Sequence, residues 1–292
     1  MTIEDAIRRA KIIGQARLQQ QGTSGEVRQQ SGDVQRYADG SRDAARTDAM
    51  PSMRFDPLPT VEISADACEQ NRVLVMESQL REFPTADAAY RLLRSRLQNR
   101  LKQNNWFSLA IASPSQSDGK SITSLNLAVS IAREKQKPVY LLDLDMRNPS
   151  ICRFLGVRDI RPLPDYFQGK ARAEEVLFQT NLPNFIIAGA LEPADNASEL
   201  LAGPRLGELL THIRFRSPNA FVLVDLPPVN VTDEALLVGP RVDAFLMVVS
   251  EGKTERKNLA QALITLGEFT VAGVVVNRSS DSQTTEYSKY SA

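Results

Sequence analysis

The sequence is poor in the residues that many enzymes use for metal binding and nucleophilic catalysis. Its 292 residues contain one histidine, His212, and two cysteines, Cys68 and Cys152. A disulfide framework and a zinc site rich in cysteine or histidine are therefore excluded, and the low cysteine content fits a reducing compartment. Catalysis by a Ser-His-Asp or Cys-His arrangement would have to use His212, which we interpret as an ordinary structural histidine.

Charge imbalance and long apolar runs are also missing. The 35 Lys and Arg residues balance the 35 Asp and Glu residues, which argues against nucleic-acid binding through overall positive charge. No stretch approaches the ~18 consecutive apolar residues of a membrane-spanning helix, and the charged N-terminal segment lacks the apolar core of a secretory signal. We expect a cytoplasmic protein, or one held at a membrane by something other than its own span.

Composition divides the chain into three parts. Residues 1–20 have helical apolar spacing and a basic face, and predict an amphipathic docking helix that binds either its own domain or a partner or membrane. Residues 21–60 are rich in Gln, Ser, Gly, Asp and Arg and predict a disordered linker. Residues 61–292 predict a single folded domain, although 61–83 give only weak signals.

Apolar runs alternate with helical patterns beyond residue 86. A helix with a leucine stripe and a basic face is predicted at 87–103. Strands are predicted at 107–112, 138–143, 184–188, 220–225, 243–250 and 271–276, and helices between them at 121–134, 196–202, 204–214 and 254–267. This alternation predicts an α/β fold, with a mostly parallel sheet covered by helices on both faces.

The segment SPSQSDGKS, residues 113–121, follows the first of these strands and opens a helix. It matches the end of the phosphate-loop pattern G-x-x-x-x-G-K-[ST], with Pro114 in place of the first glycine. Backbone amides of residues 117–121 would surround phosphate oxygens at the positive end of the helix. Lys120 would reach the terminal phosphates, and Ser121 would supply a hydroxyl to Mg²⁺. The segment predicts nucleotide binding.

Three aspartates stand at the ends of two later strands. Asp143 and Asp145 are separated by one residue, so both are expected to project to the same side, beside the phosphate loop. One of them could help to hold a metal, and the other could take a proton from an attacking hydroxyl. Turn or capping roles are the alternative for this pair. Asp225 ends the apolar run FVLVD, the Walker B pattern.

Together these segments resemble the bacterial tyrosine kinases of capsule and exopolysaccharide synthesis, within the MinD/ParA-like P-loop class. The resemblance rests on residues 113–128, 141–150, 196–210, 223–229 and 274–278, on the run AYRLLRSRL at 89–97, and on a tail that contains Tyr287 and Tyr290. It spans about residues 70–292. It implies a P-loop NTPase-type fold, with ATP and Mg²⁺ as ligands.

The resemblance also implies residue roles. Lys120 would grip the β- and γ-phosphates, and Asp143 would accept the proton of the attacking tyrosine. Ser121, Asp145 and Asp225 would bind the metal, and Asn277 would contact the adenine. The phosphate loop would contact the nucleotide through Ser117, Asp118, Gly119, Lys120, Ser121 and Ile122.

Partners follow from the resemblance as well. A neighbouring subunit of a homo-oligomeric ring would phosphorylate Tyr287 and Tyr290, and a separate membrane-anchored protein of the polysaccharide chain-length type would activate the kinase. Three departures bear on this: the tyrosine cluster is short, Ser117 replaces a common glycine, and Ala88 replaces the Glu of an assembly helix E-x-x-R-x-x-R. The adjacent Asp87 is expected to point elsewhere on that helix.

Two other functions remain open. A MinD/ParA-like ATPase switch would hydrolyse ATP without phosphorylating protein, and a regulator or scaffold would bind ATP with little turnover. Many such ATPases carry a second lysine early in the phosphate loop, and residues 113–118 contain none. That absence favours the kinase.

Overall fold

The computed structural model describes residues 55–279. The predicted docking helix, most of the predicted linker, and Tyr287 and Tyr290 lie outside the described residues. Within the described part, no helix combines the length and the hydropathy needed to cross a bilayer.

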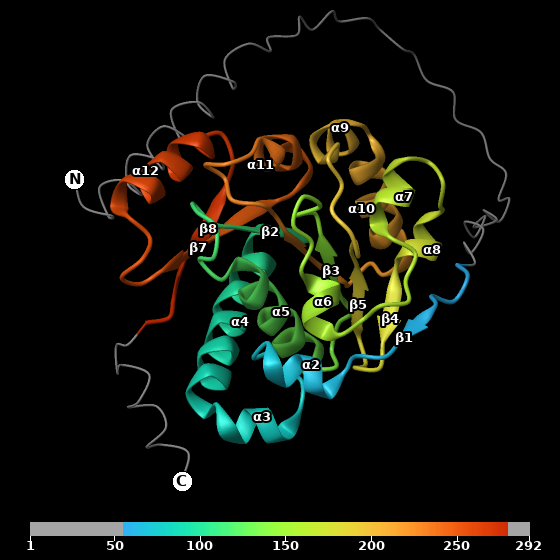
Figure 1. Ribbon diagram of the computed structural model, residues 1–292, viewed down its shortest axis with the longest axis horizontal. Coiled ribbons are helices and arrows are strands. Elements are labelled where there is room, and N and C mark those ends of the chain that lie inside the picture. Colours follow the sequence, from blue (N-terminus) through green and yellow to red (C-terminus); the bar gives the residue numbers. More distant parts are fainter. Residues whose placement is uncertain (1–54, 280–292) are drawn as a thin grey trace, which may run out of the picture.

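One sheet runs through the described part (Figure 1), in the strand order β1-β4-β5-β3-β6-β2-β7-β8. Neighbouring strands are parallel except β4 and β5, which are antiparallel. The mostly parallel α/β sheet that the sequence predicts is thus confirmed. The strands are β1 (Thr60–Val61), β2 (Ser108–Ala112), β3 (Val139–Asp143), β4 (Phe178–Thr180), β5 (Phe185–Ala188), β6 (Phe221–Asp225), β7 (Ala244–Ser250) and β8 (Val271–Asn277).

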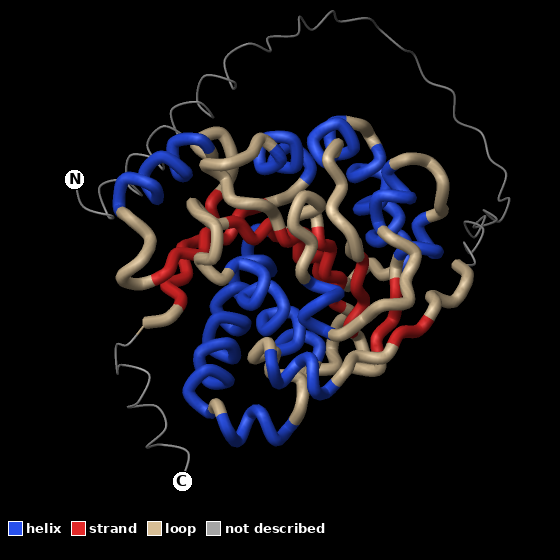
Figure 2. Tube along the Cα trace, in the orientation of Figure 1, coloured by secondary structure: helices blue, strands red, loops and turns tan. Residues whose placement is uncertain are grey.

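Helices cover both faces of the sheet (Figure 2). Alternate residues of each central strand enter opposite cores: Leu109 and Ile111 pack on one side, Ala110 and Ala112 on the other. The first core contains α2 (Ala65–Gln70), α4 (Pro84–Asn104), α5 (Lys120–Ala132) and α6 (Ile151–Leu155). The second contains α7 (Leu163–Phe167), α8 (Ala173–Val176), α9 (Ala197–Ala202), α10 (Arg205–Arg216), α11 (Glu234–Val238) and α12 (Arg256–Thr265).

Short elements account for most differences from the sequence-based expectation. The weak segment 61–83 forms α2 and α3 (Glu77–Glu82), and the helix expected from residue 87 starts at Pro84. Helices α6, α7, α8 and α11 and strands β1 and β4 were not predicted. These helices of four or five residues and strands of two or three residues are too short to show a hydrophobic period, so the pattern carries no signal for them.

The folded domain begins before residue 61. The predicted boundary between linker and domain falls inside β1, which pairs with β4. Phe55 meets His212 edge-on, with ring centroids 5.3 Å apart.

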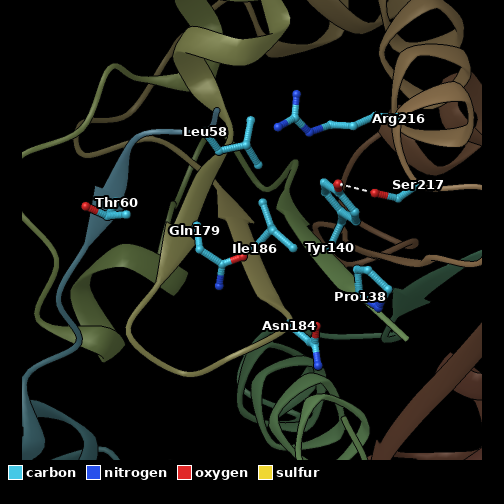
Figure 3. A pocket seen from close by; sticks show the side chains of 9 residues that line it. All are labelled: Leu58, Thr60, Pro138, Tyr140, Gln179, Asn184, Ile186, Arg216 and Ser217. Carbon is cyan, nitrogen blue, oxygen red and sulfur yellow. Dashed lines mark hydrogen bonds between the residues drawn. The ribbon is translucent and has the colours of Figure 1, made fainter. Parts of the chain in front are cut away.

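A cavity of about 250 Å³ lies at the amino end of β3 and β5. Figure 3 shows the side chains that line it, among which Tyr140 and Ser217 form a hydrogen bond of 3.0 Å. Two residues of the predicted linker, Leu58 and Thr60, line this cavity. The other lining residues are Pro138, Tyr140, Gln179, Asn184, Ile186, Arg216 and Ser217.

The basic face of α4 is partly engaged within the domain. Arg94 pairs with Glu134 at 2.9 Å, and Arg100 donates to the carbonyl of Ala272 on β8. Asp87, expected to point elsewhere on the helix, forms an ion pair with Arg91 at 3.2 Å. The contacts of Arg94 and Arg100 tie α4 to its own domain, whereas the Asp87–Arg91 pair lies within the helix.

Candidate nucleotide-binding and catalytic site

The phosphate loop joins the end of β2 to the start of α5. Two of its residues, Ser117 (φ 62°) and Gly119 (φ 94°), have left-handed backbone conformations. Alternating backbone handedness of this kind turns successive amides toward one point and creates a concave anion site. Helix α5 begins directly after it at Lys120, so its positive end adds to the attraction for phosphate.

Asp118 shapes this loop from within. Its carboxylate is fully buried, accepts the amide N–H of Ser115 at 3.0 Å and accepts the hydroxyl of Thr254 at 2.8 Å. The side chain therefore points into the protein, and only its backbone remains for a nucleotide. The sequence marks Asp118 as a loop residue but gives no sign of its bond to Thr254, which lies 136 residues away.

Asn277 rests against the same loop at the end of β8. Its side-chain amide donates to the carbonyl of Asp118 at 3.0 Å. A Cβ atom on residue 119 would overlap that amide, so a glycine is required here by space as well as by its φ. The close contact couples the end of β8 to the phosphate loop.

Lys120 lies between two carboxylates. Its Nζ is 2.6 Å from Oδ2 of Asp145 and 3.5 Å from Oδ2 of Asp225. Burial lowers the pKa of Lys120, but Asp225, Asp145 and Asp143 outweigh burial, and the net pKa lies above its ordinary value. The lysine is thus a permanently charged group at the mouth of the loop.

Asp225 is fully buried at the centre of the site. Ser121 donates to its Oδ2 at 2.6 Å, and Ser124 donates to its Oδ1 at 2.8 Å. Burial raises its pKa, while Lys120 and the two hydroxyls oppose that rise. Ser124 is one helical turn beyond Lys120 and was not singled out in the sequence.

Asp143 and Asp145 have different surroundings, which their spacing did not indicate. Asp145 faces the cleft beside Lys120, whereas Asp143 is fully buried and does not line the cleft. Asp143 accepts backbone N–H bonds from Ser150 and Ile151 at 2.9 and 3.0 Å and from Asp145 at 3.2 Å. Burial and the neighbouring Asp225 raise the pKa of Asp143 to about 7, against the opposing effects of the backbone N–H bonds and of Lys120.

Ser117, Gly119, Lys120, Ser121 and Asp145 line a cleft of about 380 Å³. Its lining comes from the phosphate loop with Ile122, from Asp145 and the segment after β3, and from the loop after β6, including Pro227 and Pro228. Arg147 pairs with the buried Glu234 at 2.7 Å. Arg147, Arg153 and Arg278 line the cleft without having been predicted as site residues.

The donor set suits magnesium bound together with a nucleotide. Among residues 55–279, no group of three or more His, Cys, Asp and Glu side chains is arranged to hold a metal unaided. The hydroxyl of Ser121 and the carboxylates of Asp145 and Asp225 nevertheless gather around Lys120. Mg²⁺ prefers such oxygen ligands and completes its shell with water and substrate phosphates. The residues therefore fit a metal that arrives with a nucleotide.

Comparison with known proteins agrees with this geometry. The ParA family model, described as NUBPL iron-transfer P-loop NTPase, matches residues 107–287. The tyrosine-protein kinase CpsD of Streptococcus agalactiae is 26% identical over 219 residues, which cover 73% of this chain and 91% of CpsD. The tyrosine-protein kinase YwqD of Bacillus subtilis is 28% identical over 207 residues, which cover 69% of this chain and 84% of YwqD.

A solved kinase domain has the same fold. The kinase domain of the Escherichia coli tyrosine kinase ETK superposes with a TM-score of 0.61 at 26% identity, covering 67% of this chain and 78% of that domain. The phosphate loop, the strand-end aspartates and these similarities point to a nucleotide-binding protein. The chain belongs to the ParA family of P-loop NTPases and, within it, to the bacterial tyrosine kinases similar to CpsD and YwqD.

Proposed function

We propose that this chain is a protein-tyrosine autokinase of capsule or exopolysaccharide synthesis, which transfers the γ-phosphate of ATP to Tyr287 and Tyr290. The observation that carries the proposal is the ammonium of Lys120, held 2.6 Å from Asp145 at the mouth of a phosphate loop. The similarity to CpsD and YwqD extends over about 70% of the chain and supports tyrosine as the acceptor type.

In the proposed transfer, residues in and beside the cleft act on the ATP phosphates. A tyrosine oxygen attacks the γ-phosphorus, the bond from that phosphorus to the β–γ bridging oxygen breaks, and ADP leaves. Lys120 stabilises the charge on the phosphate oxygens. Mg²⁺, held by Ser121, Asp145 and Asp225, supplies further neutralisation of phosphate charge when bound. Asn277, whose side-chain amide lies against Gly119, contacts the adenine in this proposal.

Asp143 takes the phenol proton in this proposal. Its raised pKa, about 7, lets it exchange a proton near neutral pH. Because its oxygens accept three backbone N–H bonds, the incoming phenol must replace one of these donors. Asp143 therefore stays hydrogen-bonded to the backbone until an acceptor tyrosine binds.

The partners of the kinase belong to the same proposal. A membrane-anchored protein of the polysaccharide chain-length type activates the cytoplasmic kinase, and the helix predicted at residues 1–20 docks on it. Subunits of a homo-oligomer phosphorylate one another. Deletion of residues 1–20 should abolish co-purification of the membrane protein; retention of that protein would refute the docking role.

Intact mass and peptide mapping test the activity. The chain is purified from its own cells and incubated with Mg-ATP beside Lys120→Met. Phosphate on Tyr287 or Tyr290, absent from the variant, is the expected result. Changing both tyrosines to Phe should remove most phosphotyrosine; an unchanged total would show that the acceptors lie elsewhere.

An ATPase switch is the second candidate, because the ParA family model covers most of the domain. It predicts ADP release with no phosphate on protein in the same experiment. The absence of a lysine from residues 113–118 favours the kinase over this alternative.

A further inference from the structure

The rim of the cleft carries three arginines with different surroundings. Arg147 is neutralised by Glu234, and its Nη2 contacts the hydroxyl of Ser198 at 3.0 Å. Arg278 directly follows Asn277 and therefore borders the nucleotide side, beside the phosphate loop. Arg153 lines the cleft from α6, is exposed, and forms no ion pair with another described residue. Its guanidinium sits 5.3 Å from the ring centroid of the neighbouring Phe154, which also lines the cleft.

Arg153 is held at a fixed place relative to the catalytic carboxylates. It belongs to α6, whose first amide, that of Ile151, donates to Asp143 at 3.0 Å. Ile151, Cys152 and Leu155 are buried in the core, and the helix ends at Gly156 in a left-handed conformation. The unpaired cation therefore stands two residues from a backbone group bonded to the proposed base.

The proposed acceptors differ in the charge of the residue that precedes them. Glu286 precedes Tyr287, whereas Lys289 precedes Tyr290. A cation at the rim attracts a peptide with an acidic neighbour and repels one with a basic neighbour.

We propose that Arg153 is a specificity-determining residue, which binds the acidic side chain beside the acceptor and so makes Tyr287 of a second copy the preferred acceptor over Tyr290. The inference rests on the proposed kinase function and names the substrate class of its site: a tyrosine peptide with an acidic residue before the tyrosine. Phe154 provides the apolar part of the same surface.

The test measures phosphate occupancy at Tyr287 and Tyr290 by mass spectrometry, in the full-length chain expressed from its own locus. Arg153→Glu is compared with the matched control Arg158→Glu. Arg158 lies three residues beyond the end of α6, is exposed, does not line the cleft and also has no ion pair among the described residues. Arg153→Glu should lower the Tyr287-to-Tyr290 ratio at least about fivefold, the equivalent of about 1 kcal/mol for an exposed charge pair. Arg158→Glu should leave it unchanged.

Charge exchange makes the test specific to the pair. Glu286→Lys should lower the ratio like Arg153→Glu, and the double variant should restore most of it. ADP affinity of each purified variant, measured by fluorescence titration, should stay within about twofold of the original, because Arg153 belongs to α6 and not to the phosphate loop.

Two results would overturn the inference and leave the kinase function standing: an equal ratio in Arg153→Glu and Arg158→Glu, or a loss of ADP affinity in Arg153→Glu that accounts for its effect. Absence of phosphotyrosine from the unaltered chain is a different result, because it overturns the proposed function itself.

Discussion

The Nζ of Lys120 donates a hydrogen bond of 2.6 Å to Oδ2 of Asp145, and both side chains are buried. Each charge compensates the other in a place where an unpaired charge would be costly. In the proposed mechanism a triphosphate replaces Asp145 as the partner of Lys120, and the carboxylate of Asp145 then becomes available to a metal. The proposal thus links nucleotide binding to metal binding through this pair.

Lys120→Met is expected to abolish nucleotide binding and to lower the free energy of unfolding by about 3 kcal/mol, because Asp145 and Asp225 lose their buried counter-charge. Denaturant unfolding and ADP titration measure the two effects. Lys137→Met, at an exposed position, is the control. Unchanged ADP affinity in Lys120→Met would remove the lysine from its assigned role.

Replacement of the two neighbouring aspartates should separate proton transfer from metal binding. Asp143→Asn is expected to slow phosphotransfer by about 10²–10⁴-fold while retaining Mg-ADP affinity, because the residue is a base outside the cleft lining. Asp145→Asn should weaken Mg-ADP binding as well. Single-turnover kinetics and nucleotide titration with and without Mg²⁺ distinguish them, and the reverse pattern would exchange the two roles.

Gly119→Ala should disable the loop through overlap with Asn277 and an unfavourable φ. Gly252→Ala is the matched control, since its φ is 69° but a Cβ there would meet no atom within 4 Å. We expect Gly252→Ala to cost only about 1 kcal/mol of backbone strain, with normal ADP affinity, and Gly119→Ala to lose measurable affinity. Equal thermal stability and ADP binding in the two variants would contradict this.

His212 should weaken the fold in mild acid. Burial lowers its pKa; Glu174, with an oxygen 3.4 Å from Nε2, opposes this effect, and Arg216 adds to it. Below the unfolded pKa of about 6.5, the unfolded chain binds the proton more tightly, so the stability that His212 contributes is lost as pH falls toward the folded pKa. His212→Gln should therefore show a smaller fall in Tm between about pH 7.5 and 5.5. An identical fall in both proteins would refute this linkage.

Much of the fold was predictable because its central strands are long apolar runs. The predicted strand at 220–225 corresponds to β6 at Phe221–Asp225, and each of the other five predicted strands also lies within one residue of the observed bounds. Strand β4, Phe178–Thr180, is too short to show an alternation of apolar and polar residues, so the sequence does not predict it. It nevertheless forms the antiparallel pairing in the sheet. The segment before Thr60 was interpreted as linker on its polar composition, which outweighed the two apolar residues that pack, Phe55 and Leu58.

The candidate site also has a part that the sequence predicts and a part that it does not. Lys120, Ser121 and Asp225 could be predicted because they follow a local pattern at strand ends. The contacts of Asp118 with Thr254, and of Asn277 with Gly119, join segments more than 130 residues apart, and no local pattern encodes them. The separation of Asp143 from Asp145 depends on the turn after β3, where the amides of Ser150 and Ile151 fold back onto Asp143.

The contact of Asn277 with the phosphate loop limits how far the proposed acceptor can reach. Ten residues lead from Asn277 to Tyr287, and a chain of that length spans at most about 35 Å. The proposed acceptor Tyr287 therefore stays within that distance of the phosphate loop of its own subunit. Transfer between copies, as proposed, consequently requires an assembly in which the cleft of one subunit lies within about 35 Å of Asn277 of the next.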